Sequence, residues 1–258
     1  MFGSRKRRRE QRRMAPFSTD WLIILKRNIQ IYSYLCEADR KELHGHILIF
    51  LDEKKFEGCG GLQINDEIKV TIAAQACILL LHRKTNYYNM LKSILVYPSA
   101  YVAHESRPMG NGIIAEGESV RLGESWHSGA VVLSWDDVLY GAADIHDGHN
   151  VVFHEFAHQL DHDSGESHGS PVMKERSMYI AWARVLGDEY AKLRKDTEQG
   201  HRTVMDKYGA TNPAEFFAVA TECFFEKPVQ LKRKHPELYE EFMIYYQQDP
   251  TKFYHLNR

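Results

Sequence analysis

The sequence lacks the cysteine pattern that a disulfide framework or a thiolate metal site would need. No CxxC motif occurs among its four cysteines, which are Cys36, Cys59, Cys77 and Cys223. A chain of 258 residues can bury a hydrophobic core without covalent cross-links. Isolated thiols are typical of proteins in a reducing compartment, so neither a disulfide-stapled fold nor a thioredoxin-type redox site is indicated.

The sequence also has no long hydrophobic run. No stretch of apolar residues reaches the length of about 18 that a membrane-spanning helix requires. The basic start is followed by a short apolar segment that Lys26 and Arg27 interrupt, which is too short for a secretory signal. We therefore expect a cytoplasmic protein without a membrane span.

Net positive charge is confined to the first residues of the chain. The net charge is −2, yet residues 1–14 contain seven arginines and lysines and only one glutamate. The rest of the chain is therefore acidic, which argues against a large nucleic-acid-binding face. A basic run of this kind could still contact RNA, DNA or an anionic lipid surface. We expect residues 1–17 to form a disordered basic tail and residues 18–258 to form a single domain.

The hydrophobic pattern predicts an α+β fold in which helices pack around a small sheet. Helical periodicity occurs at residues 18–35, 39–53, 66–82, 150–161, 173–195, 212–226 and 236–248. Two short β-branched runs, Ser93–Tyr97 and Ala130–Ser134, predict strands. Between them, residues 104–129 are rich in glycine, serine and charge, which predicts hairpins or a loop.

The helix predicted at residues 150–161 contains an HExxH motif. On a helix, His154 and His158 lie one turn apart on the same face, where both imidazoles can bind one Zn²⁺ ion. Glu155 points about 100° away around the helix, so its carboxylate can act as a general base without being a ligand. The remaining residues of this helix are mostly apolar and predict burial. Because buried ionisable groups are costly unless something pairs them, we expect a metal ion here.

The third ligand must come from another part of the chain. Asp161 and Ser164 stand where the extended metzincin motif has glycine and histidine. His162 follows one turn after His158 but lies about 80° around the helix from His154, so we expect it at the surface. A glutamate from a later helix would complete a His₂Glu site with one open position.

The helix predicted at residues 212–226 offers two such glutamates on one face, Glu215 and Glu222. Glu215 also fits a capping box that begins at Asn212 and has Pro213 at the first helical position. Spacing alone leaves both glutamates open as the third ligand.

The segment HEFAHQLD, together with the downstream pattern Tyr-x6-Glu-Phe-Phe-Ala-x3-Glu-x-Phe-Phe, resembles the Mlc titration factor A family of bacterial metallopeptidases. It is more remotely similar to the catalytic domain of anthrax lethal factor, and the segment GAVVLSWDD at residues 129–137 also matches the family. The resemblance covers roughly residues 20–250 and leaves out the basic start.

This resemblance implies a zincin-like, gluzincin-type fold with the HExxH motif on a central helix. The zinc ligands would be His154, His158 and Glu215, with Glu155 as the base. Tyr208 would correspond to the family tyrosine that donates a hydrogen bond to the oxyanion. Glu222 then becomes a candidate acceptor for the N–H of a ligand imidazole, and Asp161 stays without an assigned role.

The resemblance further implies a zinc peptidase, an aminopeptidase, acting on peptide substrates. It also implies association with the glucose-responsive transcriptional repressor Mlc and hence a role in regulating sugar uptake. The alternative is a regulatory binding protein without catalysis that sequesters a transcription factor.

Two surfaces could serve these functions. We expect the strand Ala130–Ser134 to offer a free edge to which a substrate backbone can add. The aromatic residues near the end of the chain form either a docking surface or, as their helical spacing favours, part of the core. They are Tyr239, Phe242, Tyr245, Tyr246, Phe253 and Tyr254.

Overall fold

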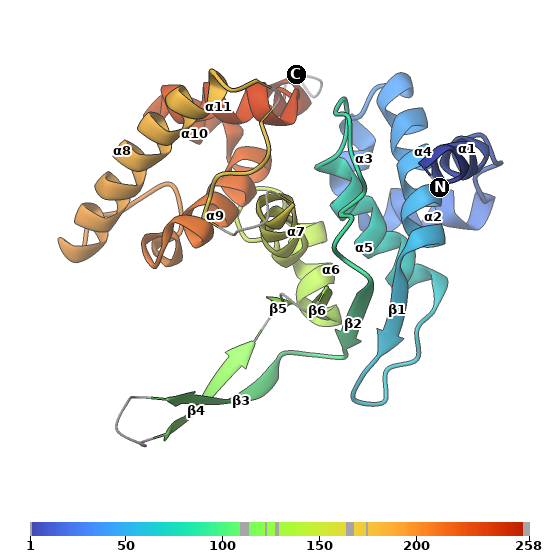
Figure 1. Cartoon of the computed structure of the whole chain (residues 1–258), viewed down its shortest axis with the longest axis horizontal. Helices are drawn as coiled ribbons and strands as arrows, with labels where there is room; N and C mark the ends of the chain where they lie inside the picture. Colours follow the sequence, from blue (N-terminus) through green and yellow to red (C-terminus); the bar gives the residue numbers. More distant parts are fainter. Residues whose placement is uncertain are drawn as a thin grey trace.

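The computed structural model describes residues 2–108, 114–121, 123–126, 129–163, 168–173 and 175–254. The predicted α+β class is confirmed, because helices surround a small sheet (Figure 1).

The helices begin and end at residues that the structure defines as follows. They are α1 Phe2–Arg13, α2 Thr19–Asn28, α3 Gln30–Tyr34, α4 Glu37–Glu53, α5 Asp66–Ile78, α6 Trp135–Ala143, α7 Val151–His162, α8 Met178–Glu198, α9 Pro213–Glu226, α10 Pro228–Lys234 and α11 Pro236–Tyr246, with 3₁₀ helices η1 Lys207–Ala210 and η2 Pro250–Tyr254. Two caps that matter for the site form as predicted. The side chain of Asn150 accepts the N–H of Phe153 at 2.9 Å, and that of Asn212 accepts the N–H of Glu215 at 3.0 Å.

The sheet has the strand order β1-β2-β6-β5. Strands β1 (Lys55–Gly58), β2 (Ser93–Tyr97) and β6 (Ala130–Ser134) are parallel, and β5 (Gly123–Trp126) is antiparallel to β6. The two strands predicted from the sequence are therefore confirmed with their bounds. Two further strands, β3 (Tyr101–Pro108) and β4 (Ile114–Arg121), form a separate antiparallel ribbon that extends away from the helices (Figure 1).

Helix α7 lies between helices α1 to α5 on one side and α8 to α11 on the other (Figure 1). It packs against α5 and α9. Every residue of α9 from Phe216 to Glu226 is buried, and the ring of Phe225 lies 5.1 Å from the ring of Phe153 on α7. Burying a side chain of this size stabilises the fold by about 1.5–3 kcal/mol. The apolar contact therefore holds α7 and α9 at a fixed distance, which sets the geometry between their polar residues.

The expectation of a disordered basic tail is wrong. Residues 2–13 form helix α1, which packs on α4 through ion pairs with nitrogen–oxygen distances of 2.7–3.0 Å. These pairs join Arg5 and Arg9 to Glu53, and Arg8 and Arg12 to Asp52. The sequence shows that the segment is basic, but it does not show that the two carboxylates at the end of α4 face this segment in the fold. Because α1 packs on α4, the structure does not divide after residue 17 as expected.

Several predicted elements have different bounds. The helix predicted at residues 18–35 is two helices, because the backbone leaves the helical region at Ile29, where φ is −118°. The helix predicted at 66–82 ends at Ile78, and the one predicted at 173–195 begins at Met178. Helices α6 and α10 and strands β1 and β5 were not predicted, because such short segments carry too few residues for a clear period.

The expected free edge of the strand Ala130–Ser134 is also wrong. Strand β6 pairs with β2 on one side and with β5 on the other. It is an interior strand, and four of its five residues are buried accordingly. The strand next to it, β5, stands at the end of the sheet order.

The aromatic residues of α11 belong to the core and do not form a docking surface. Tyr239, Phe242 and Tyr246 are fully buried, and Tyr245 is buried. Phe242 stacks on Trp182 with ring centroids 5.4 Å apart. Phe253 is half-buried, packed against the core, and the side chain of Tyr254 lies outside the part that the structure describes.

Within the described ranges, the structure contains no helix that is both long and apolar enough to span a bilayer.

Candidate metal centre

Three side chains that the sequence pointed to come together between α7 and α9. The Nε2 atom of His154 lies 3.0 Å from Oε2 of Glu215 and 3.3 Å from Nε2 of His158. The third separation, from His158 Nε2 to Glu215 Oε2, is 3.4 Å. The side chains are 14–18% exposed, so the group is partly exposed to solvent. Neighbouring turns of α7 supply the histidines, and the first turn of α9 supplies the glutamate.

These separations fit one tetrahedral ion. Zinc bonds of about 2.0–2.1 Å at tetrahedral angles place neighbouring ligand atoms roughly 3.3–3.4 Å apart. Two of the three observed distances have this value, and the third is a few tenths of an ångström shorter. Two imidazole nitrogens and one carboxylate oxygen with an open fourth position are also the donor set of catalytic zinc sites. The residues present therefore fit a zinc ion.

Glu222 lies on the other side of the His154 ring. Its Oε1 atom is 2.7 Å from Nδ1 of His154, and its Oε2 atom accepts the backbone N–H of Asn150 at 2.6 Å. When Nδ1–H donates to the carboxylate, the lone pair of Nε2 points toward Glu215 and His158. The structure thus separates the two glutamates that spacing left open. Glu215 lies with the imidazole Nε2 atoms, and Glu222 makes the hydrogen bond that was expected of it.

Glu155 is buried next to this group but is not part of it. The residue is only 5% exposed, and its Oε2 atom has no hydrogen-bond partner among the described residues. Burial raises the pKa of this carboxyl above its usual range. A buried carboxylate oxygen without a donor is costly.

The pKa values of Glu215 and His154 are shifted by their neighbours in the site. Burial acts to raise the pKa of Glu215, but hydrogen bonds from the two imidazoles outweigh it and hold that pKa well below its usual range. Burial acts to lower the pKa of His154, and the Glu222 and Glu215 carboxylates outweigh it and raise that pKa. The carboxylates of Glu215 and Glu222 therefore favour a positive charge on or beside the His154 ring.

Tyr208 lies at the edge of the site on the 3₁₀ helix η1. Its ring centroid is 6.0 Å from that of His154, and the residue is 55% exposed. The carboxylate of Asp206 accepts the backbone N–H of Tyr208 at 2.7 Å and so caps this short helix. Asp206 has no sequence pattern that singles it out, and only the fold shows that it caps the helix that carries Tyr208.

Asp161 anchors the segment that follows α7. Its two carboxylate oxygens accept the backbone N–H groups of Gly169 and Ser170 at 2.7 and 2.8 Å. Gly169 has a φ of +72°, and a Cβ atom there would lie 2.4 Å from the carbonyl oxygen of Pro213. Asp161 and Gly169 thus hold the chain against the residue that starts α9, two positions before Glu215. Sequence reasoning left Asp161 unassigned and did not single out Gly169.

A second group of side chains, Asp39, Glu42 and His82, is close enough to be considered for a metal. Both ring nitrogens of His82 are already used, one with Asp39 at 2.7 Å and one with the carbonyl oxygen of Gln247 at 2.9 Å. The neighbouring carboxylates and this carbonyl raise the pKa of His82 although burial acts to lower it, so the ring favours the protonated form. The group therefore ties α4 to the end of α11 and does not fit a metal site.

Comparison with known proteins identifies the family of the chain. The family model described as glucose-regulated metallo-peptidase M90 matches residues 4–247. An uncharacterized protein of Synechocystis sp. is 40% identical over 94% of this chain and 89% of its own length. Proteins of Yersinia pestis and Yersinia pseudotuberculosis named Mlc titration factor A are 30% identical over 86% of this chain and 83% of their own length. Because the family model spans both α7 and α9, the chain belongs to the glucose-regulated metallopeptidase family M90.

Proposed function

We propose that this protein is a zinc-dependent peptidase with a zincin-like fold. His154, His158 and Glu215 hold the metal, and the observation that carries this proposal is the set of 3.0–3.4 Å separations among their donor atoms. A zinc ion supplies Lewis acidity at its open position, which polarises a carbonyl and acidifies water there. Membership of a metallopeptidase family supports the same assignment.

The residues around the ligands then have distinct tasks. Glu155 accepts a proton as a water oxygen bonds to the peptide carbonyl carbon, and it delivers this proton to the leaving nitrogen as the C–N bond breaks. Tyr208 donates its O–H to the carbonyl oxygen as negative charge develops there. Glu222 keeps the ring of His154 oriented by accepting from Nδ1.

Metal analysis combined with peptide cleavage tests this proposal. We expect about one zinc per chain and hydrolysis of a short peptide panel that a chelator abolishes. The variant Glu155→Gln should keep its zinc and lose hydrolysis, whereas Glu198→Gln at the distant end of α8 should change neither. Full activity of Glu155→Gln, or a zinc-free protein that still cleaves peptides, would contradict the assignment.

We propose aminopeptidase specificity for this reaction, following the resemblance that the sequence showed. Blocking the amino terminus of the substrate distinguishes an aminopeptidase from an endopeptidase. We expect N-acetylated peptides to resist cleavage while the matching free peptides are cut from their first residue. Internal cleavage of blocked peptides would show an endopeptidase with the same metal chemistry.

A second function is favoured by the relatives named Mlc titration factor A. We propose that the chain binds a glucose-responsive, Mlc-like repressor in the cytoplasm, with or without catalysis. Purified repressor should bind the wild-type protein and Glu155→Gln with equal affinity if binding is independent of hydrolysis. Truncating the aromatic C-terminal helix is not a usable test, because those residues are core. Absence of binding to both forms would rule out this function.

A further inference from the structure

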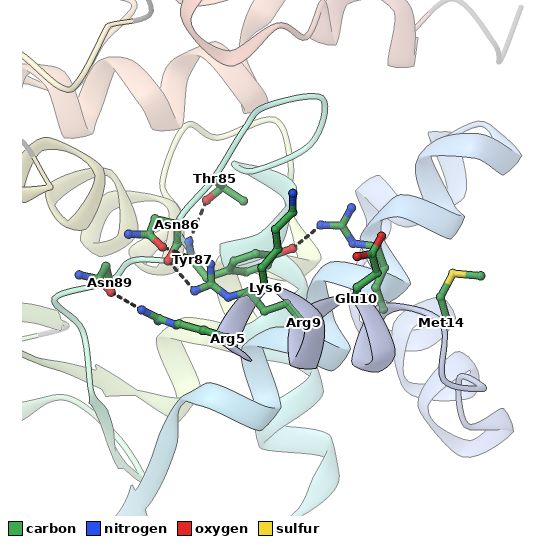
Figure 2. A pocket seen from close by; sticks show the side chains of 10 residues that line it. Arg5, Lys6, Arg9, Glu10, Met14, Thr85, Asn86, Tyr87 and Asn89 are labelled. Atoms are coloured by element: carbon green, nitrogen blue, oxygen red, sulfur yellow. Dashed lines mark hydrogen bonds between the residues drawn. The ribbon is translucent and has the colours of Figure 1, made fainter. Parts of the chain in front are cut away.

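A cavity of about 920 Å³ opens between helix α1 and the loop that joins α5 to β2 (Figure 2). None of the residues of the metal centre lines it. Helix α1 contributes four cations, Arg5, Lys6, Arg9 and Arg13. The loop contributes polar side chains that face them. The single carboxylate in the lining is Glu10, so the wall carries a net positive charge.

Arg5 and Arg9 build the wall of this cavity. Arg9 donates to both carboxylate oxygens of Glu53 at 2.7 and 2.8 Å and to the side-chain oxygen of Asn86 at 3.1 Å. Arg5 donates to Glu53 at 3.0 Å and to the side-chain oxygen of Asn89 at 2.7 Å. These bonds tie α1 to the loop and fix the positions of the groups around the opening.

The same bonds leave the lining rich in hydrogen-bond donors. Because the amide oxygens of Asn86 and Asn89 accept from arginine, their NH₂ groups are left to donate. Arg13 uses one nitrogen on the hydroxyl of Tyr87 at 2.9 Å. Within the described part of the chain, no acceptor lies within hydrogen-bond distance of its other nitrogens or of the Lys6 ammonium. Figure 2 shows the side chain of Lys6 extending past the ring of Tyr87.

We propose that this cavity binds a small molecule that carries a phosphate or diphosphate group. Phosphate oxygens accept several hydrogen bonds and match both an ammonium and the fork of a guanidinium. The volume lies within the range of about 300–1,000 Å³ that is usual for small-molecule sites. Donors converge from two separate segments on one concave space, which suits a compact anion better than an extended polymer.

Calorimetric titration of the full-length protein with inorganic diphosphate tests the proposal. We choose an ionic strength of about 0.15 M, where charges more than about 8 Å apart are largely screened. We expect a single saturable site. Lys6→Ala should weaken binding about tenfold, because it removes a charge-assisted hydrogen bond. Arg7→Ala removes the same charge from the same helix outside the lining, and we expect it to change affinity less than about twofold.

Thermal unfolding of both variants serves as the folding control, and it should be unchanged because both residues are exposed. Equal weakening by Lys6→Ala and Arg7→Ala would reduce the effect to general electrostatics and overturn the proposal. Failure of diphosphate to bind at all would also overturn it.

Two further titrations distinguish the source of the phosphate. Vesicles of equal parts phosphatidylcholine and phosphatidylglycerol test a lipid surface, and single-stranded polyuridylate tests nucleic acid. We expect diphosphate to bind without either surface present. Binding of vesicles or RNA that Arg7→Ala weakens as much as Lys6→Ala, with no diphosphate binding, would assign α1 to a polymer or membrane surface instead.

Discussion

Replacing Gly169 by alanine should lower zinc affinity from a position outside the ligand set. The added Cβ would lie 2.4 Å from the carbonyl oxygen of Pro213, whereas real Cβ contacts are at least 3.0 Å, so the two segments must separate by about 0.6 Å. The φ of +72° adds strain of about 1–2 kcal/mol for any residue with a Cβ. Because Pro213 starts the helix that carries Glu215, the displacement acts on a metal ligand.

Gly200 provides the matched control. It has a φ of +70° but nothing lies within 4 Å of its Cβ position, so Gly200→Ala carries the backbone strain without the contact. We expect both variants to lose about 1–2 kcal/mol of unfolding free energy through that strain. Gly169→Ala alone should lose more stability and about tenfold in zinc affinity, the lower end of the effect known for groups that orient metal ligands.

Urea unfolding and competition with a chromogenic chelator measure the two quantities. Equal zinc affinity in Gly169→Ala and Gly200→Ala would show that α9 does not depend on this contact. The reasoning that joins Gly169 to Glu215 would then be wrong.

Three further predictions concern other contacts of the site and core. Glu222→Gln should weaken zinc binding about 10–100-fold in the same chelator assay, because an amide has only one accepting end for the two N–H groups of His154 and Asn150. Phe153→Ala should lower the unfolding free energy by about 3–5 kcal/mol in urea, since its ring is fully buried. The two arginines beside Glu53 outweigh its burial and hold its pKa at about 2, below the usual 4.5. The stability from this carboxylate is therefore present above pH 4.5 and lost as pH falls toward 2. Glu53→Gln should flatten that part of the stability profile, and an unchanged profile would mean that the α1 ion pairs contribute nothing.

Patterns in the sequence predicted those parts of the fold whose structure depends on residues that are close together in the sequence. The strands β2 and β6 have the bounds that their β-branched runs indicated. The starts of α7 and α9 follow from Asn150 and Asn212, whose side chains cap the next N–H groups wherever the helix is placed. The His154 and His158 pair follows from helical spacing alone.

The failures came where long-range contacts decide the outcome. The segment of helix α1 is predicted to be disordered because a run of like charges is typical of a solvated extension, and the carboxylates that hold it lie about 40 residues away in the sequence. Strand β6 was expected at an edge because the pairing of β5 on its far side has no signature in β6 itself.

By itself, the sequence determined that two histidines and a buried glutamate share one helix, because spacing along a helix fixes which side chains share a face. It could not determine which carboxylate of α9 faces the imidazole Nε2 atoms, because Glu215 and Glu222 are equivalent in spacing. The packing of α9 against α7 decided this by placing Glu215 at 3.0 Å from Nε2 and Glu222 at 2.7 Å from Nδ1 of one ring. Distances between separate helices depend on how the apolar core fills, and only the tertiary structure contains that information.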